Sequence, residues 1–424
     1  MSQPTYYALD PQTIPAAISA IDGIGQKLGG SPDGWKIREV GDGNLNLVFI
    51  VEGPSGGLVV KQALPYVRLV GESWPLPLDR AYYEANALRI QTQHAPGLTP
   101  AIYYTDRNMA LIVMEYLHPH IVLRKGLVKG IRYPLAASAI AEFMAKTLFN
   151  TSVLASSAAE HKQRIALFAP NTALCKITED LVFTDPYRVA SLNRWTRPFL
   201  DAIKVQFEND VPLKLAVQHK KWQFLTQAEA LIHGDLHAGS IMVTQTDTRI
   251  IDPEFAFVGP MAFDVGAVIG NFLLAYFAHR GQLTRSVNDD YPNWLLGQIE
   301  AIWQQFEDRF VACWKSQQAG DVYAQDLFDA ISAQLLFEQQ KKSFMLNLFQ
   351  ESLQFAGCKM IRRILGLAHV EDMESIVDPQ IRARCETLAL HFGRELVLHG
   401  KTYTTIQEVT AAAAASLTPR EPSP

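Results

Sequence analysis

Three carboxylates lie on two short turns within residues 231–264, and each turn follows an apolar run. The first turn, H-G-D-L-H, presents Asp235 after an apolar lead-in. The second β-like run ends at Asp252, Pro253 and Glu254, so that two acids stand at positions i and i+2. One carboxylate of such a set can accept the proton of an attacking hydroxyl, and the others are oxygen ligands of the kind that Mg²⁺ prefers beside nucleotide phosphates. The stretch therefore indicates phosphoryl transfer, and a polar hairpin without chemistry is the alternative.

Composition narrows the class of protein. With 424 residues, 48% hydrophobic and 19% charged, the chain has the make-up of an ordinary globular enzyme of two or three compact units. Its net charge of −5, without long runs of like charge, argues against binding to nucleic acid or to an anionic membrane surface. The four cysteines lack C-x-x-C spacing, which argues against a zinc site or a disulfide framework and fits a reducing compartment.

The sequence predicts no segment that enters a membrane. The first residues, M-S-Q-P-T-Y-Y-A-L-D, lack the charged and apolar regions of a signal peptide. The longest apolar stretch, 265–278, contains Asn271 and is too short to span a bilayer, so we expect a buried core helix there. These features predict a cytoplasmic protein.

A glycine-containing turn is expected between the first two strands of a small sheet, at 35–40 and 47–52. The turn contains Gly41, Asp42, Gly43 and Asn44. Glycines let a backbone approach a phosphate without interference from a Cβ atom, although Asp-Gly is also common in plain hairpins. A third strand is expected to end at Lys61, which favours a phosphate-binding turn. An edge-strand lysine that discourages aggregation is the alternative for this residue.

The rest of the chain is predicted to be mainly helical. Two further strands, at 101–105 and 109–114, lead to Glu115, Tyr116 and Leu117, where the pattern changes. We therefore divide the chain into an N-terminal helical extension at 1–34 with a helix at 13–28, an N-lobe at 35–116, a C-lobe at 117–405 and a flexible tail at 406–424. The helices expected after the N-terminal extension lie at 79–93, 133–157, 197–215, 223–230, 262–279, 294–316, 322–337, 342–367 and 379–398.

The motifs H-G-D-L-H-A-G-S, D-P-E-F-A-F-V-G-P-M-A-F-D and G-D-G-N-L-N resemble those of the S-methyl-5-thioribose kinase family. This family belongs to the small-molecule branch of the protein-kinase-like fold, and its metal motif is D-x-E. In that branch the first motif usually ends in asparagine, where this chain has Ser240. The resemblance implies an α+β fold of two lobes, with a small N-lobe that contains a β-sheet and a larger, mainly helical C-lobe. It also implies ATP and Mg²⁺ as cofactors, and a homodimer.

The resemblance assigns roles to residues in both lobes. It implies that Asn44 contacts the nucleotide, that Lys61 reaches the α- and β-phosphates, and that backbone groups at 115–117 bind the adenine edge. Glu84 is the favoured carboxylate partner of Lys61 on the helix at 79–93, with Asp79 as the other acid there and an exposed glutamate as the alternative.

In the C-lobe, the resemblance implies that Asp235 is the catalytic base and that Asp252 and Glu254 hold the metal. Arg362 and Arg363 stand where the family has a sugar-binding arginine pair; exposed surface charge is the alternative. Asp264 either supports the catalytic loop through hydrogen bonds or is simply an acid favoured in the first turn of a helix.

The implied reaction is ATP-dependent phosphorylation of S-methyl-5-thio-D-ribose on its anomeric hydroxyl, in methionine salvage. Another small-molecule kinase of the same fold, acting on an aminoglycoside, choline or a different sugar, is the first alternative. The arginines at the expected acceptor site count against an aminoglycoside, which needs an acidic cleft. A nucleotide-binding regulator without chemistry is the second alternative, although the three acids and Lys61 are all present.

Overall fold

The computed structural model describes residues 6–41, 45–68, 71–280, 290–317, 320–328 and 330–416. Three of the residues expected to bind nucleotide, Asp42, Gly43 and Asn44, lie outside the described residues, as does the end of the expected tail at 417–424.

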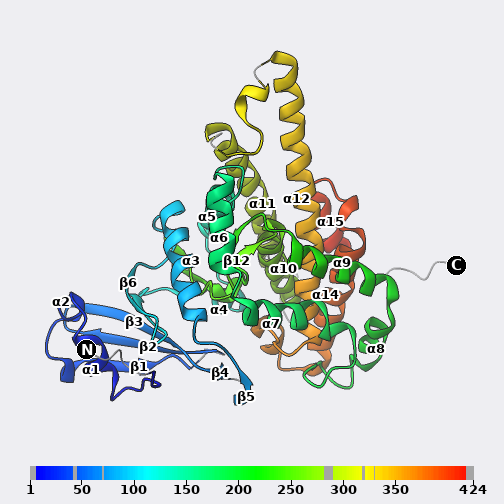
Figure 1. Cartoon of the computed structure of the whole chain (residues 1–424). Coiled ribbons are helices and arrows are strands. Elements are labelled where there is room, and N and C mark those ends of the chain that lie inside the picture. The colour runs from blue at the N-terminus through cyan, green and yellow to red at the C-terminus, as the bar shows by residue number, and fades with distance from the viewer. Residues whose placement is uncertain are drawn as a thin grey trace.

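The N-lobe is a five-stranded antiparallel sheet with the order β1-β2-β3-β7-β6 (Figure 1). Lys61 lies on β3 in the middle of this sheet, opposite Val48 on β2 and Ile112 on β7. Its side chain is buried, so the alternative of an edge-strand lysine is wrong. The strands are β1 (Lys36–Glu39), β2 (Asn46–Gly53), β3 (Gly56–Ala63), β6 (Ile102–Asp106) and β7 (Leu111–Glu115).

Helices cover both faces of the sheet. On one face, α1 (Ile14–Ser19) and α2 (Ile24–Leu28) bury isoleucine and leucine side chains against β2 and β3. The single helix predicted at 13–28 is wrong, because Gly23 adopts a left-handed φ of 79° between these two helices. On the other face, α3 (Arg80–His94) packs its alanines against β3 and β7.

A short hairpin, β4 (Tyr66–Val67) and β5 (Gly71–Pro75), connects the sheet to α3. Val67 and Leu76 in this connection pack against Leu174 and Leu181 of α7 (Thr172–Phe183), with Trp74 beside them. The connection therefore ties the N-lobe to the C-lobe.

The C-lobe is built around α10 (Met261–Arg280), in which every residue except Arg280 is buried. By length and composition α10 could cross a membrane, and it is the one such helix in the described part of the chain. The buried core helix expected at 265–278 is confirmed. The other helices are α4 (Leu123–Val128), α5 (Ala136–Asn150), α6 (Ala158–Phe168), α8 (Asp201–Asn209), α9 (Val211–Thr226), α11 (Tyr291–Ser316), α12 (Ile331–Leu365), α13 (Glu371–Glu374), α14 (Pro379–His399) and α15 (Ile406–Ala415).

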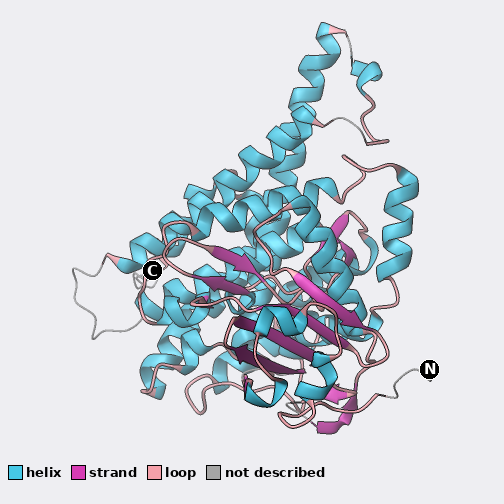
Figure 2. Cartoon of the chain, turned by 90° about the vertical axis from the view of Figure 1, so that its left-hand side faces the viewer, coloured by secondary structure: helices cyan, strands magenta, loops and turns pink. Residues whose placement is uncertain are grey.

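Several predicted boundaries are corrected. The helix expected at 342–367 and the second half of the helix expected at 322–337 form one helix, α12, whose N-terminal half projects from the body of the lobe (Figures 1 and 2). The first half of the helix expected at 322–337 is wrong, because α12 begins at Ile331 and, among the described residues, only a 3-10 turn, Gln325–Phe328, precedes it. The helix expected at 197–215 is broken at Asp210, whose side chain caps α9 by accepting the N–H of Leu213. No helix covers 227–229 in the described structure: α9 ends at Thr226 and a strand follows.

The flexible tail predicted at 406–424 is wrong for its first part, because α15 spans Ile406–Ala415. Thr405 and Glu408 form a capping box at its start, and Ile406, Val409 and Ala413 are buried. The alanine-rich composition hid this pattern, in which the buried positions recur at i, i+3 and i+7.

Five short strands frame the acidic motifs within the C-lobe. They are β8 (Ile121–Val122), β9 (Ala230–Ile232), β10 (Ile241–Val243), β11 (Thr248–Ile250) and β12 (Phe257–Gly259). β10 pairs with β11 and β8, and β9 pairs with β12. The turn with Asp235 therefore joins two of these small sheets, and the turn with Asp252 leads back from one to the other.

Candidate active site

The catalytic-loop candidate, residues 233–237, is held by Asp264 from the first turn of α10. One carboxylate oxygen of Asp264 accepts the backbone N–H of His233 at 2.6 Å, and the other accepts that of Gly234 at 3.0 Å. Gly234 has a φ of 82°, and a Cβ there would lie 2.2 Å from the carbonyl oxygen of Phe255, so only glycine fits. Asp264 therefore supports the loop through hydrogen bonds, in addition to lying in the first turn of its helix.

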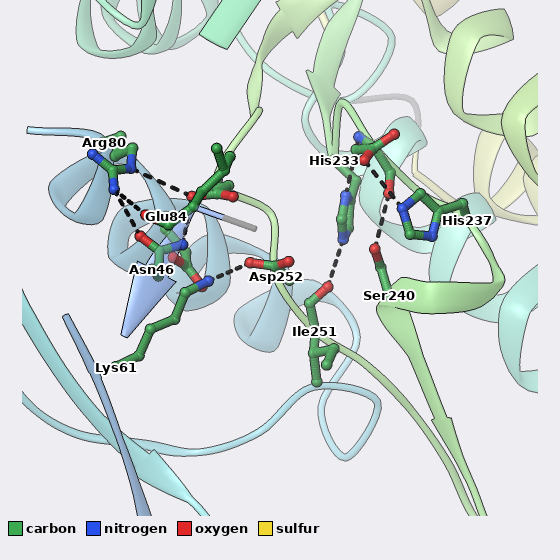
Figure 3. Close-up of polar contacts among 12 residues, drawn as sticks. Asn46, Lys61, Arg80, Glu84, His233, His237, Ser240, Ile251 and Asp252 are labelled. Atoms are coloured by element: carbon green, nitrogen blue, oxygen red, sulfur yellow. Dashed lines mark hydrogen bonds and ion pairs between the residues drawn. The ribbon is translucent and has the colours of Figure 1, made fainter. Parts of the chain in front are cut away.

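His233 links this loop to the second acidic turn. The N–H of Asp235 points to Nδ1 of His233 at 3.3 Å, so the proton of the ring is on Nε2, which donates to the carbonyl of Ile251 at 2.8 Å (Figure 3). The residue after Ile251 is Asp252. The ring of His233 thus fixes the spacing between the two acidic motifs.

The carboxylate of Asp235 is held by two side chains. Lys359 Nζ lies 3.0 Å from Oδ1, and His237 Nε2 lies 3.2 Å from Oδ2. Burial opposes ionisation of Asp235, but the charge of Lys359 leads the causes that hold its pKa well below the ordinary value. Ser240, which replaces the usual asparagine of the motif, donates its hydroxyl to the backbone carbonyl of Asp235 at 3.0 Å.

A second group of acids lies at the end of β11, where the lobes meet. Carboxylate oxygens of Glu84, Asp252 and Glu254 lie within 4.8 Å of one another. Lys61 forms ion pairs with Glu84, at 2.7 Å, and with Asp252 (Figure 3). The predicted partnership of Lys61 with Glu84 is therefore confirmed, and the alternative of an exposed glutamate is wrong. Asp79 pairs with Arg107 instead, at 3.0 Å.

The electrostatics of this group favour a cation. Burial and neighbouring carboxylates raise the pKa of Glu84 to about 8, even though Lys61 lowers it. Burial, followed by the charge of Asp252, raises the pKa of Glu254. One ammonium thus faces three crowded carboxylates whose hard oxygens suit Mg²⁺, so the donor set fits this ion.

Two residues that the sequence reasoning missed hold Glu254 in place. Nδ2 of Asn46 donates to Glu254 Oε2 at 2.8 Å, and Arg80 Nε lies 3.7 Å from the same oxygen. Arg80 is fully buried and also donates to Asn46 Oδ1 at 3.1 Å and to the carbonyl of Leu45 at 2.7 Å. A signal was available, because Arg80 and Glu84 stand at i and i+4 on one predicted helix and must share a face.

The remaining nucleotide-site candidates lie around the sheet. Gly41 is the last described residue before the glycine-containing turn. Glu115 ends β7 and is followed by half-buried Tyr116 and buried Leu117. Glu115 pairs with Leu58 and Lys61 pairs with Ile112, so the two positions are three residues apart along the strands, or about 10 Å at ~3.3 Å per residue.

The arginine pair is buried, so the alternative of exposed surface charge is wrong. Arg362 and Arg363 lie in the last turn of α12, one turn after Lys359. Within the described part of the chain, Nε and Nη1 of Arg362 and Nε of Arg363 have no hydrogen-bond partner. A nearby arginine, Arg124, is by contrast paired with Asp372 and with the side-chain oxygen of Asn271. The pair therefore offers free donors beside Asp235, toward which Arg362 and Arg363 are both attracted.

Comparison with known proteins gives the family. Residues 36–294 match the model of the phosphotransferase enzyme family. The chain is 46% identical to methylthioribose kinase 1 of Oryza sativa subsp. japonica over 406 residues, which cover 95% of this chain and 94% of the relative. It is 44% identical to methylthioribose kinase of Escherichia coli over 410 residues, covering 96% and 97%. The chain belongs to the methylthioribose kinase family.

Likeness to solved structures is more distant than the likeness to these methylthioribose kinases. A glucosamine kinase in complex with glucosamine, ADP and inorganic phosphate aligns with 84% of this chain and 79% of that chain, at a TM-score of 0.45 and 12% identity. The membership in a phosphotransferase family confirms the expected protein-kinase-like fold with an α+β, two-lobed architecture.

Proposed function

We propose that this chain transfers the γ-phosphoryl group of ATP to the anomeric hydroxyl of S-methyl-5-thio-D-ribose, giving the 1-phosphate in methionine salvage. The single observation that carries this proposal is near-full-length identity of 46% with a methylthioribose kinase, together with an acidic site in which Asp235, Asp252 and Glu254 are all present. Asp264 also holds the catalytic loop by accepting two of its backbone N–H groups, an arrangement that is expected in an active kinase rather than in one that has lost its activity.

Asp235 is the group that faces the acceptor. It orients the anomeric hydroxyl and accepts its proton as the hydroxyl oxygen bonds to the γ-phosphorus. The bond from phosphorus to the β,γ-bridging oxygen breaks, and its electron pair leaves with ADP. Because Asp235 is strongly acidic here, it takes the proton only as the new O–P bond makes the hydroxyl more acidic.

Asp252 and Glu254 would hold Mg²⁺ with the nucleotide phosphates. The ion would neutralise charge that builds up between the β- and γ-phosphates during transfer. Lys61, which pairs with Asp252 in this structure, would move toward the α- and β-phosphates when the nucleotide arrives. Glu84 keeps the ammonium within reach of both positions.

The nucleotide would lie between the lobes. In this arrangement Gly41, Asp42, Gly43 and Asn44 cover the phosphates, and the backbone at 115–117 receives the adenine. The support is the ~10 Å separation along β3 and β7 between the expected hinge and Lys61. We accordingly keep the lobe boundary at residue 116 and assign the acceptor site to the C-lobe.

Arg362 and Arg363 would bind the acceptor sugar. Their free guanidinium nitrogens form planar donor groups that suit neighbouring hydroxyls. A buried arginine without a partner costs stability, so the bound sugar would satisfy donors that the protein itself leaves unpaired.

A panel of acceptors tests the function. ADP release is measured with ATP and methylthioribose, choline, an aminoglycoside and a second pentose, with the Asp235→Asn variant as the control for uncoupled hydrolysis. We expect turnover with methylthioribose to exceed that with each other acceptor. Preference for another acceptor would identify a different small-molecule kinase, and nucleotide binding without turnover of any acceptor would identify a regulator.

We further propose a cytoplasmic homodimer. All four cysteines are free, as a reducing compartment would leave them. The projecting half of α12 and the turn before it expose large apolar side chains, which a second copy could cover: Leu327, Ile331, Leu335 and Leu336 are 65–80% exposed. Light scattering should give a dimer that Leu335→Glu weakens and Val377→Glu, at a lone exposed valine elsewhere, does not. A monomeric wild-type protein would overturn this assembly.

A further inference from the structure

Lys359 reaches from α12 to the catalytic loop. Its Nζ lies 3.0 Å from Asp235 Oδ1 and 4.4 Å from the centre of the Phe263 ring. The side chain is buried, so its ammonium has exchanged water for one carboxylate and one aromatic face. Lysines are rarely buried unless they are paired. Lys359 is therefore paired with Asp235, the acid that we propose as the catalytic base.

His237 holds the other oxygen of the same carboxylate. The N–H of Gly239 donates to Nδ1 of His237 at 2.8 Å, so the ring proton is on Nε2, which faces Asp235 Oδ2 at 3.2 Å. Burial lowers the pKa of His237 to about 4, so the ring is neutral near pH 7 and acts as a hydrogen-bond donor. Both carboxylate oxygens of Asp235 therefore have a side-chain donor, Lys359 for Oδ1 and His237 for Oδ2.

We propose that Lys359 is a positioning residue for phosphoryl transfer, which with His237 turns the free lone pairs of Asp235 toward the acceptor hydroxyl. This inference rests on the proposed role of Asp235. A carboxylate with a fixed orientation presents its lone pair to the acceptor hydroxyl in one geometry. Such preorganisation contributes to catalysis because less entropy is lost when the reacting groups reach the transition state. The ammonium also keeps the carboxylate ionised in a site where burial favours the neutral acid.

Other charged groups lie around Lys359 and Asp235, and they limit how much the removal of Lys359 should change the rate. Arg362 and Arg363 also attract the Asp235 carboxylate, so removal of Lys359 leaves part of the positive field in place. The charged and titratable groups around Asp235 and Lys359 are Arg124 on α4, His237 on the loop, Asp264 on α10, and Arg362 and Arg363 on α12.

The test compares two variants of Lys359 with a matched control. Lys359→Met removes the charge and the donor, whereas Lys359→Gln keeps a donor and removes the charge. The control is Lys220→Met, because Lys220 is another buried lysine, on α9, that stands 5.1 Å from the Phe355 ring. Steady-state kinetics with methylthioribose are measured from pH 4 to pH 9, with folding checked by circular dichroism.

We expect Lys359→Met to lower kcat roughly 10- to 150-fold, the equivalent of one charge-assisted hydrogen bond, with the KM for ATP unchanged. Its acidic limb of kcat should move up to higher pH, into the measured range, because loss of an adjacent cation raises the pKa of Asp235. Lys359→Gln should recover part of kcat and keep the shifted limb. Lys220→Met should have the wild-type kcat and limb.

A folded Lys359 variant with the wild-type acidic limb would overturn the proposal, whatever its kcat. If neither variant folds, the ¹³C shift of the Asp235 carboxyl in the wild-type enzyme decides, with Asp235→Asn providing the assignment. The shift should not change through pH 4, and an ordinary titration near pH 3.9 would sink the proposal. Failure of the proposed function looks different, because the wild-type enzyme itself would then not turn over methylthioribose.

Discussion

The side-chain amide of Asn46 donates a 2.8 Å hydrogen bond to Oε2 of Glu254, across 208 positions of the chain. Asn46 begins β2 in the N-lobe, and Glu254 belongs to the acidic turn of the C-lobe. Arg80 approaches both residues from α3. The position of Glu254 is therefore set by the N-lobe, so that a change in how the lobes meet would alter the geometry of the candidate metal site.

The acids of this turn should differ in their effect on the metal requirement. Asp252→Ala should abolish Mg²⁺-dependent activity, since Asp252 also carries the contact with Lys61. Glu254→Ala should raise the Mg²⁺ concentration needed for half-maximal rate, because one oxygen ligand is lost. Initial rates against Mg²⁺ at saturating ATP measure both. Asp247→Asn, in the turn of the same hairpin, is the control, and an unaltered Mg²⁺ dependence in both test variants would remove the turn from the metal site.

Asp235→Asn tests the catalytic base. Asparagine keeps the shape of the side chain but cannot accept the proton, and loss of such a group is typically worth about 10²- to 10⁴-fold in turnover. Affinity for ATP, measured by calorimetry, should change little, because the side chain of Asp235 contacts Lys359 and His237 and not the residues proposed to bind the nucleotide. Near-normal turnover in this variant would exclude Asp235 from the mechanism.

Asp264→Asn should loosen the catalytic loop. In the wild type each oxygen of Asp264 accepts one backbone N–H, from His233 or from Gly234. Asparagine has only one side-chain oxygen and places an NH₂ group where the second oxygen was, so one of the two buried N–H groups loses its acceptor. We expect a fall in kcat and a loss of roughly 1–3 kcal/mol in the free energy of unfolding. Glu229→Gln is a matched control, because Glu229 accepts the N–H of Met261 at 2.9 Å near the same helix start without touching the loop. Equal losses of kcat in both variants would argue against a specific role for Asp264.

The sequence predicted the parts of the site that local pattern determines. The sequence pointed to an acid after an apolar run, a lysine on the third strand and a glutamate on the next helix, and the structure joins Asp252, Lys61 and Glu84. The strand itself continues to Ala63, two residues beyond the expected end at Lys61. The strands of the N-lobe were also expected close to where they lie, although burial along β2 does not alternate, because helices cover both faces of the sheet. Buried α10 was recognised from its continuous apolar run.

The residues that were missed act through tertiary approach. Asn46, Arg80 and Lys359 lie 208, 174 and 124 positions from the acids that they contact, taking Arg80 with Glu254, and no local signal reports such distances. The continuity of α12 was missed because the polar residues at 338–343, of which only Lys341 is buried, interrupt its apolar pattern between Phe337 and Phe344. The alanines of α15 concealed its buried face.

Lys220→Met should stabilise the protein near neutral pH. Lys220 is 1% exposed and, among the described residues, its Nζ has no hydrogen-bond partner; burial lowers its pKa from 10.5 to about 8. The unfolded chain binds more protons between these values, so the wild-type stability should rise from pH 8 to pH 10.5 through this group. The titratable groups near it are Glu229, Glu351, Cys358 and Lys401.

Urea denaturation of wild type and Lys220→Met across pH 7–10.5 measures this effect. The variant should be more stable by up to roughly 3 kcal/mol below pH 8, using about 1.36 kcal/mol per pKa unit, and the difference should shrink toward pH 10.5. Lys341→Met is the control, because that buried lysine has a partner, Glu338, at 2.9 Å. A constant difference across the range would contradict the buried charge as its cause.

The arginine pair should give unequal kinetic losses. Arg363 donates to the carbonyl of Ala368 at 3.4 Å, whereas Arg362 has two free nitrogens, Nε and Nη1, in the described structure. Successive residues on a helix point about 100° apart, so the two guanidiniums reach different atoms of the bound reactants. Each charge-assisted hydrogen bond is worth roughly 1.5–3 kcal/mol, or about 10- to 150-fold. One alanine variant should mainly raise the KM for methylthioribose, and the other should lower kcat if its arginine contacts the transferring phosphoryl group.

Lysine replacements separate charge from shape at the same two positions. A lysine restores the charge but not the planar pair of donors, so Arg362→Lys and Arg363→Lys should recover little of the lost activity. The kinetics are measured with methylthioribose varied at saturating ATP. The control is Arg309→Ala, on α11, whose guanidinium donates to Ser138 and Gln305 far along the chain from the catalytic loop. Wild-type constants in both alanine variants would show that the acceptor binds elsewhere, since burial already excludes a merely exposed pair.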